Sequence, residues 1–255
     1  MKYAIDTMKN ALVSILGDNV VSIYLYGSVA MDDFKLGWSD IDIICFIKHI
    51  MSEEQAEELV ELRQNLLKLD QNNTYFRSFE GAIVSLEEFY NEEYTRVVYW
   101  GTSGQRITNN YVFDVFSRYE LMNDGILLYG NDIRQSLCLP TYLQLREGVM
   151  QHLETIRKHA ITTNQSLYSC GWLLDTARCL YTLRTGQVIS KTMAGYWALE
   201  QELCPVEEDL RKTIMIRNEP MKYKNMPEVV SWLSLLGESV QVFANVLEIE
   251  LEQTK

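Results

Sequence analysis

The chain contains 255 residues, enough for one large domain or two smaller ones. Apolar residues make up 47% and charged residues 23%, a balance that excludes wholesale disorder and is typical of a globular protein. The formal net charge of −12 opposes binding to a phosphate backbone, so we expect no long nucleic acid as a partner. Most of the acidic excess lies before residue 141, so this part of the chain is the one expected to bind cations.

The sequence shows no membrane or disulfide signal. No apolar run approaches the roughly 18 residues of a spanning helix, and Asp6 and Lys9 interrupt any signal-peptide core. We therefore expect a cytoplasmic protein with no membrane partner. The five cysteines are scattered without Cys-x-x-Cys spacing, so we expect reduced thiols rather than a disulfide framework or a zinc site.

Helix and strand patterns alternate in the first part of the chain. Gly17 ends a helix, Gly27 and Ser28 stop a strand, and Ser52 with Gln55 forms a capping box before a leucine-rich helix. The patterns predict, in chain order, a helix over 6–16, a strand over 20–26, a strand over 40–47, a helix from 53 onwards and a strand over about 77–86. This order favours a small α/β domain.

The second part of the chain has a helical pattern. All four prolines lie at or after position 140, so we place the boundary there and predict domains over 1–140 and 141–255. Apolar residues recur with helical periodicity over 143–162, 169–184, 190–202 and 227–252. We predict an α+β fold, in which an N-terminal α/β domain with a mixed sheet is followed by a C-terminal bundle of helices.

One pattern in the first part points to chemistry. Gly27-Ser28 ends a strand, and after eleven residues Asp40 and Asp42 begin the next one. Residues i and i+2 of a strand point to the same face, so the two carboxylates can converge on a divalent cation. Mg²⁺ bound to a triphosphate suits oxygen ligands of this kind, and a glycine turn lets backbone N–H groups approach phosphate closely. The pattern therefore predicts a magnesium and nucleotide site.

This arrangement resembles the signature of the polymerase-β-like nucleotidyltransferase superfamily. The resemblance implies a third carboxylate on a following strand, and Glu80 is the acid that enters the strand over 77–86. It is expected as a metal ligand or as a general base that takes a proton from an attacking hydroxyl. Glu87 and Glu88 compete for this role, but they begin a helix, where acids are common.

A second resemblance covers residues 176–191 and 194–199, which look like the C-terminal domain of aminoglycoside nucleotidyltransferases that modify streptomycin and spectinomycin. It implies that Lys191 reaches the ATP phosphates. Ser39 and Asp114 are further candidates for nucleotide binding. The sequence departs from the family over 155–174, which contains no Asp or Glu, and Tyr168 stands where a drug-binding carboxylate is expected.

Acceptor binding is expected from residues around this departure. Asp175 lies two helical turns beyond Tyr168 on the same face and is a substitute acid. Arg178 and the rings of Tyr168 and Trp100 complete the candidates for substrate binding.

Together these features predict an enzyme that transfers AMP from ATP to a hydroxyl of an aminoglycoside or aminocyclitol, with Mg²⁺ as cofactor and release of pyrophosphate. Two alternatives remain open. The same chemistry can act on a protein side chain or another metabolite, or the scaffold can be a non-catalytic nucleotide-binding module.

Overall fold

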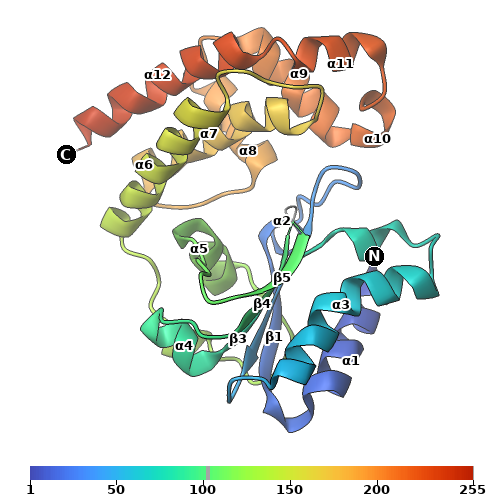
Figure 1. Ribbon diagram of the computed structural model, residues 1–255. Coiled ribbons are helices and arrows are strands. Elements are labelled where there is room, and N and C mark those ends of the chain that lie inside the picture. The colour runs from blue at the N-terminus through green and yellow to red at the C-terminus, as the bar shows by residue number, and fades with distance from the viewer. Residues whose placement is uncertain (102–103, 255) are drawn as a thin grey trace. The chain divides into compact units, whose positions relative to one another are not determined.

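The computed structural model describes residues 1–101 and 104–254. It divides into two compact units. The first comprises Met1–Asp32, Asp40–Phe113 and Glu120–Leu139, and the second comprises Asp33–Ser39, Asp114–Tyr119 and Pro140–Lys255. A mixed sheet with helices and a helical region are therefore both present, which confirms the predicted α+β class (Figure 1).

A six-stranded mixed sheet forms the centre of the first unit, in the order β5-β4-β3-β2-β1-β6. Only β2 and β3 pair in parallel, and the other neighbours are antiparallel. The strands are β1 (Val20–Tyr26), β2 (Ile41–Ile47), β3 (Phe79–Ser85), β4 (Val97–Gly101), β5 (Gly104–Thr108) and β6 (Ile126–Gly130). Their β-branched and aromatic residues favour this extended conformation.

Two long helices of the first unit, α1 (Lys2–Leu16) and α3 (Glu53–Leu69), lie side by side in Figure 1. The predicted capping box of Ser52 and Gln55 is present at the start of α3 and satisfies backbone groups there. The indole N–H of Trp100 donates to the carbonyl of Leu59 at 2.9 Å, which ties β4 to α3. The first unit also contains α2 (Gly27–Ala30) and α4 (Leu86–Asn91). α5 (Val115–Asn123) is divided between the two units, and its residues from Glu120 onwards belong to the first.

The first part of the chain confirms the predicted strands, with changes at their ends. β2 begins one residue later than expected, and β3 begins at Phe79 because Thr74–Arg77 forms a short 3₁₀ helix. The sequence reading did not include β4, β5, β6 or α5. β5 has a polar sequence with exposed positions, as expected for a strand at the edge of a sheet.

The second unit is built from helices around one apolar core. They are α6 (Tyr142–His159), α7 (Tyr168–Thr185), α8 (Lys191–Glu200), α9 (Glu207–Asn218), α10 (Pro220–Tyr223), α11 (Pro227–Leu233) and α12 (Gly237–Gln253). The first three match predicted helices. Gly186 ends α7 with φ of +69°, and the Ser190 side chain accepts a hydrogen bond from the Met193 N–H at the start of α8.

The prediction of one continuous helix over 227–252 is wrong. The segment is broken between α11 and α12, which are bent by 51° relative to each other. An added Cβ at Gly237 would lie 2.1 Å from the carbonyl oxygen of Ile161, so the start of α12 packs directly on another backbone segment. Within the described residues, no single helix is long and apolar enough to cross a membrane, although this bent pair passes the same test when taken together.

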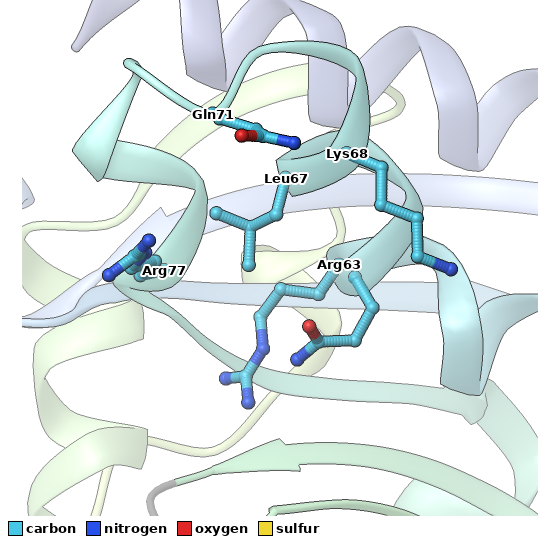
Figure 2. Close-up of a pocket in the computed structure, with 6 residues that line it drawn as sticks. Arg63, Leu67, Lys68, Gln71 and Arg77 are labelled. Atoms are coloured by element: carbon cyan, nitrogen blue, oxygen red, sulfur yellow. The ribbon is translucent and has the colours of Figure 1, made fainter.

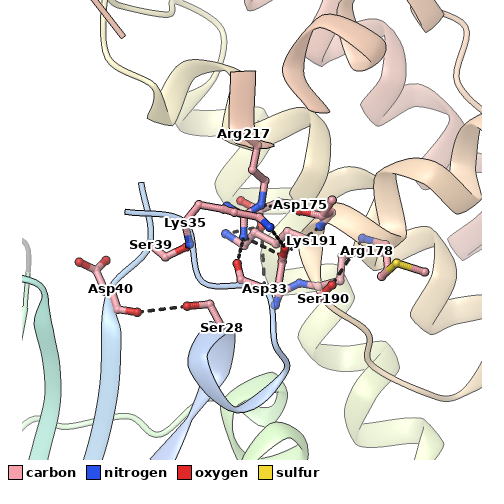
Figure 3. Close-up of polar contacts among 12 residues, drawn as sticks. Ser28, Asp33, Lys35, Ser39, Asp40, Asp175, Arg178, Ser190, Lys191 and Arg217 are labelled. Carbon is pink, nitrogen blue, oxygen red and sulfur yellow. Dashed lines mark hydrogen bonds and ion pairs between the residues drawn. The ribbon is translucent and has the colours of Figure 1, made fainter. Parts of the chain in front are cut away.

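A buried ion pair joins the segment Asp33–Ser39 to α9. Arg217 donates to the Asp33 carboxylate at 2.8 Å, and the side chains are only 3% and 6% exposed (Figure 3). The Thr192 N–H also donates to Asp33, and Arg217 donates to the Thr192 hydroxyl. Burial alone raises the pKa of Asp33, but the charge and hydrogen bonds of Arg217 outweigh it and hold the pKa below its ordinary value.

Replacing Arg217 with Met is expected to lower the free energy of unfolding by up to about 3–5 kcal/mol at pH 7, because Asp33 then loses its closest counter-charge and retains only the more distant Lys35, at 3.7 Å. The depressed pKa means that the ion pair stabilises the fold above the ordinary carboxyl pKa of about 4 and loses this effect as the pH falls through the folded-state value. The measurement is urea unfolding followed by circular dichroism at several pH values.

The matched control for this prediction is Arg211→Met on the same helix. Arg211 pairs with Glu207 at the surface, where an ion pair contributes about 0–1 kcal/mol. Equal losses in the two variants would contradict a special role for the buried pair.

Candidate active site

Asp42 and Glu80 lie side by side in the first unit because β2 and β3 run parallel. The two residues are direct register partners, so their side chains leave the sheet on the same face. Asp40 immediately precedes β2. The three acids predicted from the sequence are therefore held at the starts of two neighbouring strands.

Gly27 lies directly against the Asp42 carboxyl group. Its φ is +63°, and an added Cβ would lie 2.1 Å from Asp42 Oδ2. The backbone N–H of Ser28 donates to the Asp42 carboxylate. The Ser28 hydroxyl donates to the carbonyl of Asp40 at 3.1 Å (Figure 3). The Gly-Ser turn and the Asp-x-Asp segment thus form one contiguous structure, although eleven residues separate them in the sequence.

Negative charge is concentrated around Asp42. Removal from water raises the pKa of the Asp42 carboxyl group well above its ordinary value, and the charges of Glu120, Asp40 and Glu80 raise it further. The Ser28 N–H opposes this rise. A cation bound here would relieve the repulsion among the four carboxylates.

Glu120 was not found by sequence reasoning. It lies in α5, and the side chain is 6% exposed. Among the neighbouring charges, that of Glu120 raises the pKa of Asp42 most. The sequence marks it only as one acid in a short segment of mixed polarity, and no helix was predicted there.

The donor chemistry of this site fits magnesium in part. Among the described residues, no group of three His, Cys, Asp or Glu side chains is arranged to hold a metal ion. Mg²⁺ in nucleotide-dependent enzymes is usually bound by one or two carboxylates together with substrate phosphates and water. Asp40 and Asp42 supply hard oxygen ligands of this type beside the Gly27-Ser28 turn, so they fit a metal that arrives with a nucleotide.

The Glu80 carboxylate accepts a hydrogen bond from a residue of the neighbouring strand β4. The Tyr99 hydroxyl donates to Glu80 Oε1 at 2.8 Å. Burial and the proximity of Glu80 raise the pKa of Tyr99, so the hydroxyl keeps its proton at neutral pH.

A basic cavity of about 430 Å³ lies along α3 in the first unit (Figure 2). Its lining residues are Arg63, Gln64, Leu67, Lys68, Gln71 and Arg77. Arg63 donates to the Phe79 carbonyl at 2.8 Å, next to Glu80 in the chain. Removal from water lowers the pKa of Arg63, whereas the charges of Glu80 and Asp40 oppose this decrease. The positive charge of Arg63 therefore interacts with the negative charges of Glu80 and Asp40.

In the second unit, Asp175 is neutralised by two cations. Lys191 lies 2.8 Å and Arg178 lies 3.8 Å from the Asp175 carboxylate (Figure 3). Removal from water raises the pKa of Asp175, but the charges of Lys191 and Arg178 outweigh it and hold the pKa below its ordinary value. Asp175 therefore holds Lys191 and Arg178 beside each other in the second unit.

Asp114 and Ser39, which were predicted to bind the nucleotide, each accept hydrogen bonds from nearby backbone groups. The side chain of Asp114 accepts hydrogen bonds from the backbone of Phe116 and Ser117 at the start of α5. The hydroxyl of Ser39 accepts a hydrogen bond from the backbone N–H of Lys35. Their roles in nucleotide binding stay predictions.

The two aromatic side chains predicted to contact the acceptor differ in solvent exposure. Tyr168 is 59% exposed and lines a cavity of about 310 Å³ with Trp38 and Lys224 in the second unit. Its role in acceptor binding stays a prediction. The expectation that Trp100 offers a stacking ring is wrong, because this side chain is fully buried against α3.

Comparison with known proteins finds two family models that match parts of this chain. Residues 5–98 match the nucleotidyltransferase domain, and residues 142–213 match the C-terminal domain of aminoglycoside adenylyltransferases. A spectinomycin 9-adenylyltransferase of Staphylococcus aureus is 22% identical over 206 residues, which cover 77% of this chain and 76% of the relative.

The fold also has a solved counterpart. The crystal structure of the spectinomycin adenyltransferase AAD(9) from Enterococcus faecialis with ATP and spectinomycin superposes with a TM-score of 0.68. The match covers 97% of this chain and 99% of that chain at 18% identity, so the likeness concerns the fold. Together with the family matches, it confirms the resemblance inferred from the sequence. The chain contains a nucleotidyltransferase domain and is similar to the aminoglycoside adenylyltransferases.

Proposed function

We propose that the protein transfers AMP from ATP to a hydroxyl of an aminoglycoside or aminocyclitol and releases pyrophosphate. The observation that carries this proposal is the contact of Gly27 and Ser28 with Asp42, beside Asp40 and Glu80. A turn that suits phosphate and carboxylates that suit a divalent cation are joined there. The overall acidic charge supports a small cationic acceptor rather than a long nucleic acid.

Each residue has a distinct role in this proposal. Asp40 and Asp42 would hold Mg²⁺, which supplies positive charge to the α-phosphate and to the leaving pyrophosphate. Gly27 leaves room for the Asp42 carboxylate, and Ser28 holds Asp40 and Asp42 by hydrogen bonds at the turn where the phosphates would bind. Glu80 takes the proton from the acceptor hydroxyl as its oxygen bonds to the α-phosphorus and the bond to pyrophosphate breaks.

Lys191 is the residue of the second unit that we assign to the ATP phosphates, as the family resemblance implies. Asp175 lies 2.8 Å from Lys191 and 3.8 Å from Arg178, so it holds both cations in place. Arg178 and Asp175 stay candidates for acceptor binding.

Spectinomycin is the first acceptor to test. The relatives compared above are named as spectinomycin adenylyltransferases. This chain has no acid over 155–174, which favours an acceptor with few cationic groups over a polycationic aminoglycoside. Glu120 adds a carboxylate next to Asp42 that can attract such an acceptor.

The direct test measures pyrophosphate release with ATP, Mg²⁺ and either spectinomycin or streptomycin, with mass spectrometry of the drug. We expect an added AMP on the drug and no release without a divalent cation. Labelling of protein alone, with no modified drug, would overturn the acceptor assignment. Binding of ATP with no transfer to any acceptor would overturn the assignment as an enzyme of this reaction.

Asp42→Asn is expected to lower kcat by about 1000-fold or more, because several kcal/mol of metal-dependent stabilisation is lost. The fold should persist, since the substitution removes a charge that is repelled by its neighbours. Thermal unfolding by circular dichroism checks this. Asp18→Asn makes the same chemical change at an exposed position and should retain activity. Undiminished turnover by Asp42→Asn would contradict the metal assignment.

Gly27→Ala is expected to lower kcat and stability together, because the new methyl group would displace the Asp42 carboxylate. Gly17→Ala is the matched control, since Gly17 has a similar φ of +54° but no atom within 4 Å of an added Cβ. Both variants carry backbone strain of roughly 1–3 kcal/mol. Only Gly27→Ala should also impair transfer, as measured by initial rates under saturating ATP. Equal activity of the two variants would show that the contact with Asp42 is unimportant.

A further inference from the structure

We propose that Tyr99 is a positioning residue for the transfer reaction, in which its hydroxyl fixes one oxygen of Glu80 and leaves the other oxygen to accept the proton. This inference rests on the proposed function, with Glu80 as the general base. It adds a residue that the motifs do not contain. The supporting observations are the register of β4, the hydrogen bond itself and the packing that holds the tyrosine.

The sheet register brings Tyr99 to Glu80. Tyr99 is the register partner of Ala82 across the β3–β4 pair, and Ala82 lies two residues beyond Glu80. Residues i and i+2 of a strand share a face, so Tyr99 and Glu80 leave the sheet on the same side. The Tyr99 hydroxyl donates to Glu80 Oε1 at 2.8 Å, a normal distance for such a bond.

Only one oxygen of Glu80 is used in this way. Within residues 1–101 and 104–254, the bond from Tyr99 is the one hydrogen bond made by the Glu80 side chain. Oε2 is left as an acceptor. The carboxylate is therefore oriented without both of its oxygens being occupied.

Two neighbours pack against the Tyr99 ring, and a glycine leaves room for its hydroxyl. The Arg106 guanidinium lies 4.7 Å from the ring centroid, on the register partner of Tyr99 in β5. The ring of Tyr111 lies 6.2 Å away. An added Cβ at Gly101 would lie 2.2 Å from the Tyr99 hydroxyl oxygen, so the absence of a side chain at Gly101 leaves room for this oxygen. The tyrosine is thus held before it orients Glu80.

The chemical consequence follows from how a general base works. The acceptor proton moves to Glu80 Oε2, the acceptor oxygen bonds to the α-phosphorus, and the bond to pyrophosphate breaks. Tyr99 keeps its own proton throughout. A base contributes about 10²–10⁴-fold only when it lies within hydrogen-bond reach of the proton, so a carboxylate that rotates freely loses part of this factor.

The first experiment compares Tyr99→Phe with Tyr90→Phe. Tyr90 also lies in the first unit, where its hydroxyl bonds to Ser136 at the surface, so the control removes the same atom away from the site. We expect Tyr99→Phe to lower kcat for spectinomycin by roughly 10- to 100-fold with KM for ATP unchanged. Tyr90→Phe should keep wild-type rates. A Tyr99→Phe variant with wild-type kcat, or with an equal rise in KM for ATP, would overturn the proposal.

The second experiment separates positioning from structural support by a double-mutant cycle. If Tyr99 acts only through Glu80, adding Tyr99→Phe to Glu80→Gln should cause no further loss of kcat. A structural role would lower kcat again in the Glu80→Gln background, and this result would overturn the proposal. Gly101→Ala keeps both side chains but displaces the hydroxyl, so it should reproduce the loss seen in Tyr99→Phe.

The same cycle distinguishes failure of the proposed function. If Glu80→Gln alone retains wild-type kcat, Glu80 is not the base and the functional assignment of this residue fails. If Glu80→Gln is inactive while Tyr99→Phe is fully active, the proposed function stands and only the role of Tyr99 is refuted.

Discussion

The repulsion between Asp42 and the neighbouring carboxylates is the constraint on which the site depends. Removal from water and the charges of Glu120, Asp40 and Glu80 all favour the protonated form of Asp42. The Ser28 N–H opposes this effect at Asp42. Arg63 supplies positive charge near Glu80 and Asp40, and a bound cation would relieve the repulsion that remains among the acids. This explains why a metal with a nucleotide fits the site better than a preformed metal cage does.

The sheet supplies the geometry that this chemistry needs. The parallel pairing of β2 and β3 aligns Asp42 with Glu80, whereas the antiparallel pairing of β1 and β2 places Tyr26, next to Gly27, opposite Asp42. Strand register is fixed wherever one face is covered by apolar packing, because a slip of one residue would turn each side chain to the other face. The apolar residues further along these strands therefore hold the acids in position, although they contact no substrate.

The sequence predicts the elements with strong local signals and misses those determined by tertiary contacts. The strand over 20–26, the Ser52 capping box and the Gly186 helix end are confirmed because turn and cap residues mark them locally. The break between α11 and α12 and the burial of Trp100 depend on contacts with distant segments, which no local pattern shows.

The same distinction holds within the site. Asp40 and Asp42 are recognisable by their spacing from Gly27-Ser28, and Glu80 because the family resemblance implies an acid on a following strand. The proximity of Asp42 and Glu80 follows from strand pairing. Glu120 and Tyr99 carry no motif, and only the folded sheet brings them beside these acids. The binding of a cationic drug by Asp175 stays a prediction, and its pairing with Lys191 could not be read from α7 alone because Lys191 lies in α8.

The path of the chain between Ser28 and Asp40 has a consequence for evolution and engineering. Asp33–Ser39 belongs to the second unit, where Arg217 neutralises Asp33, although the residues on either side belong to the first unit. Segments of the two units therefore alternate along the sequence. A gene cut near codon 140 would separate Asp33 from its counter-charge, so swapping either half with that of a relative requires the partner of this one aspartate to be exchanged with it.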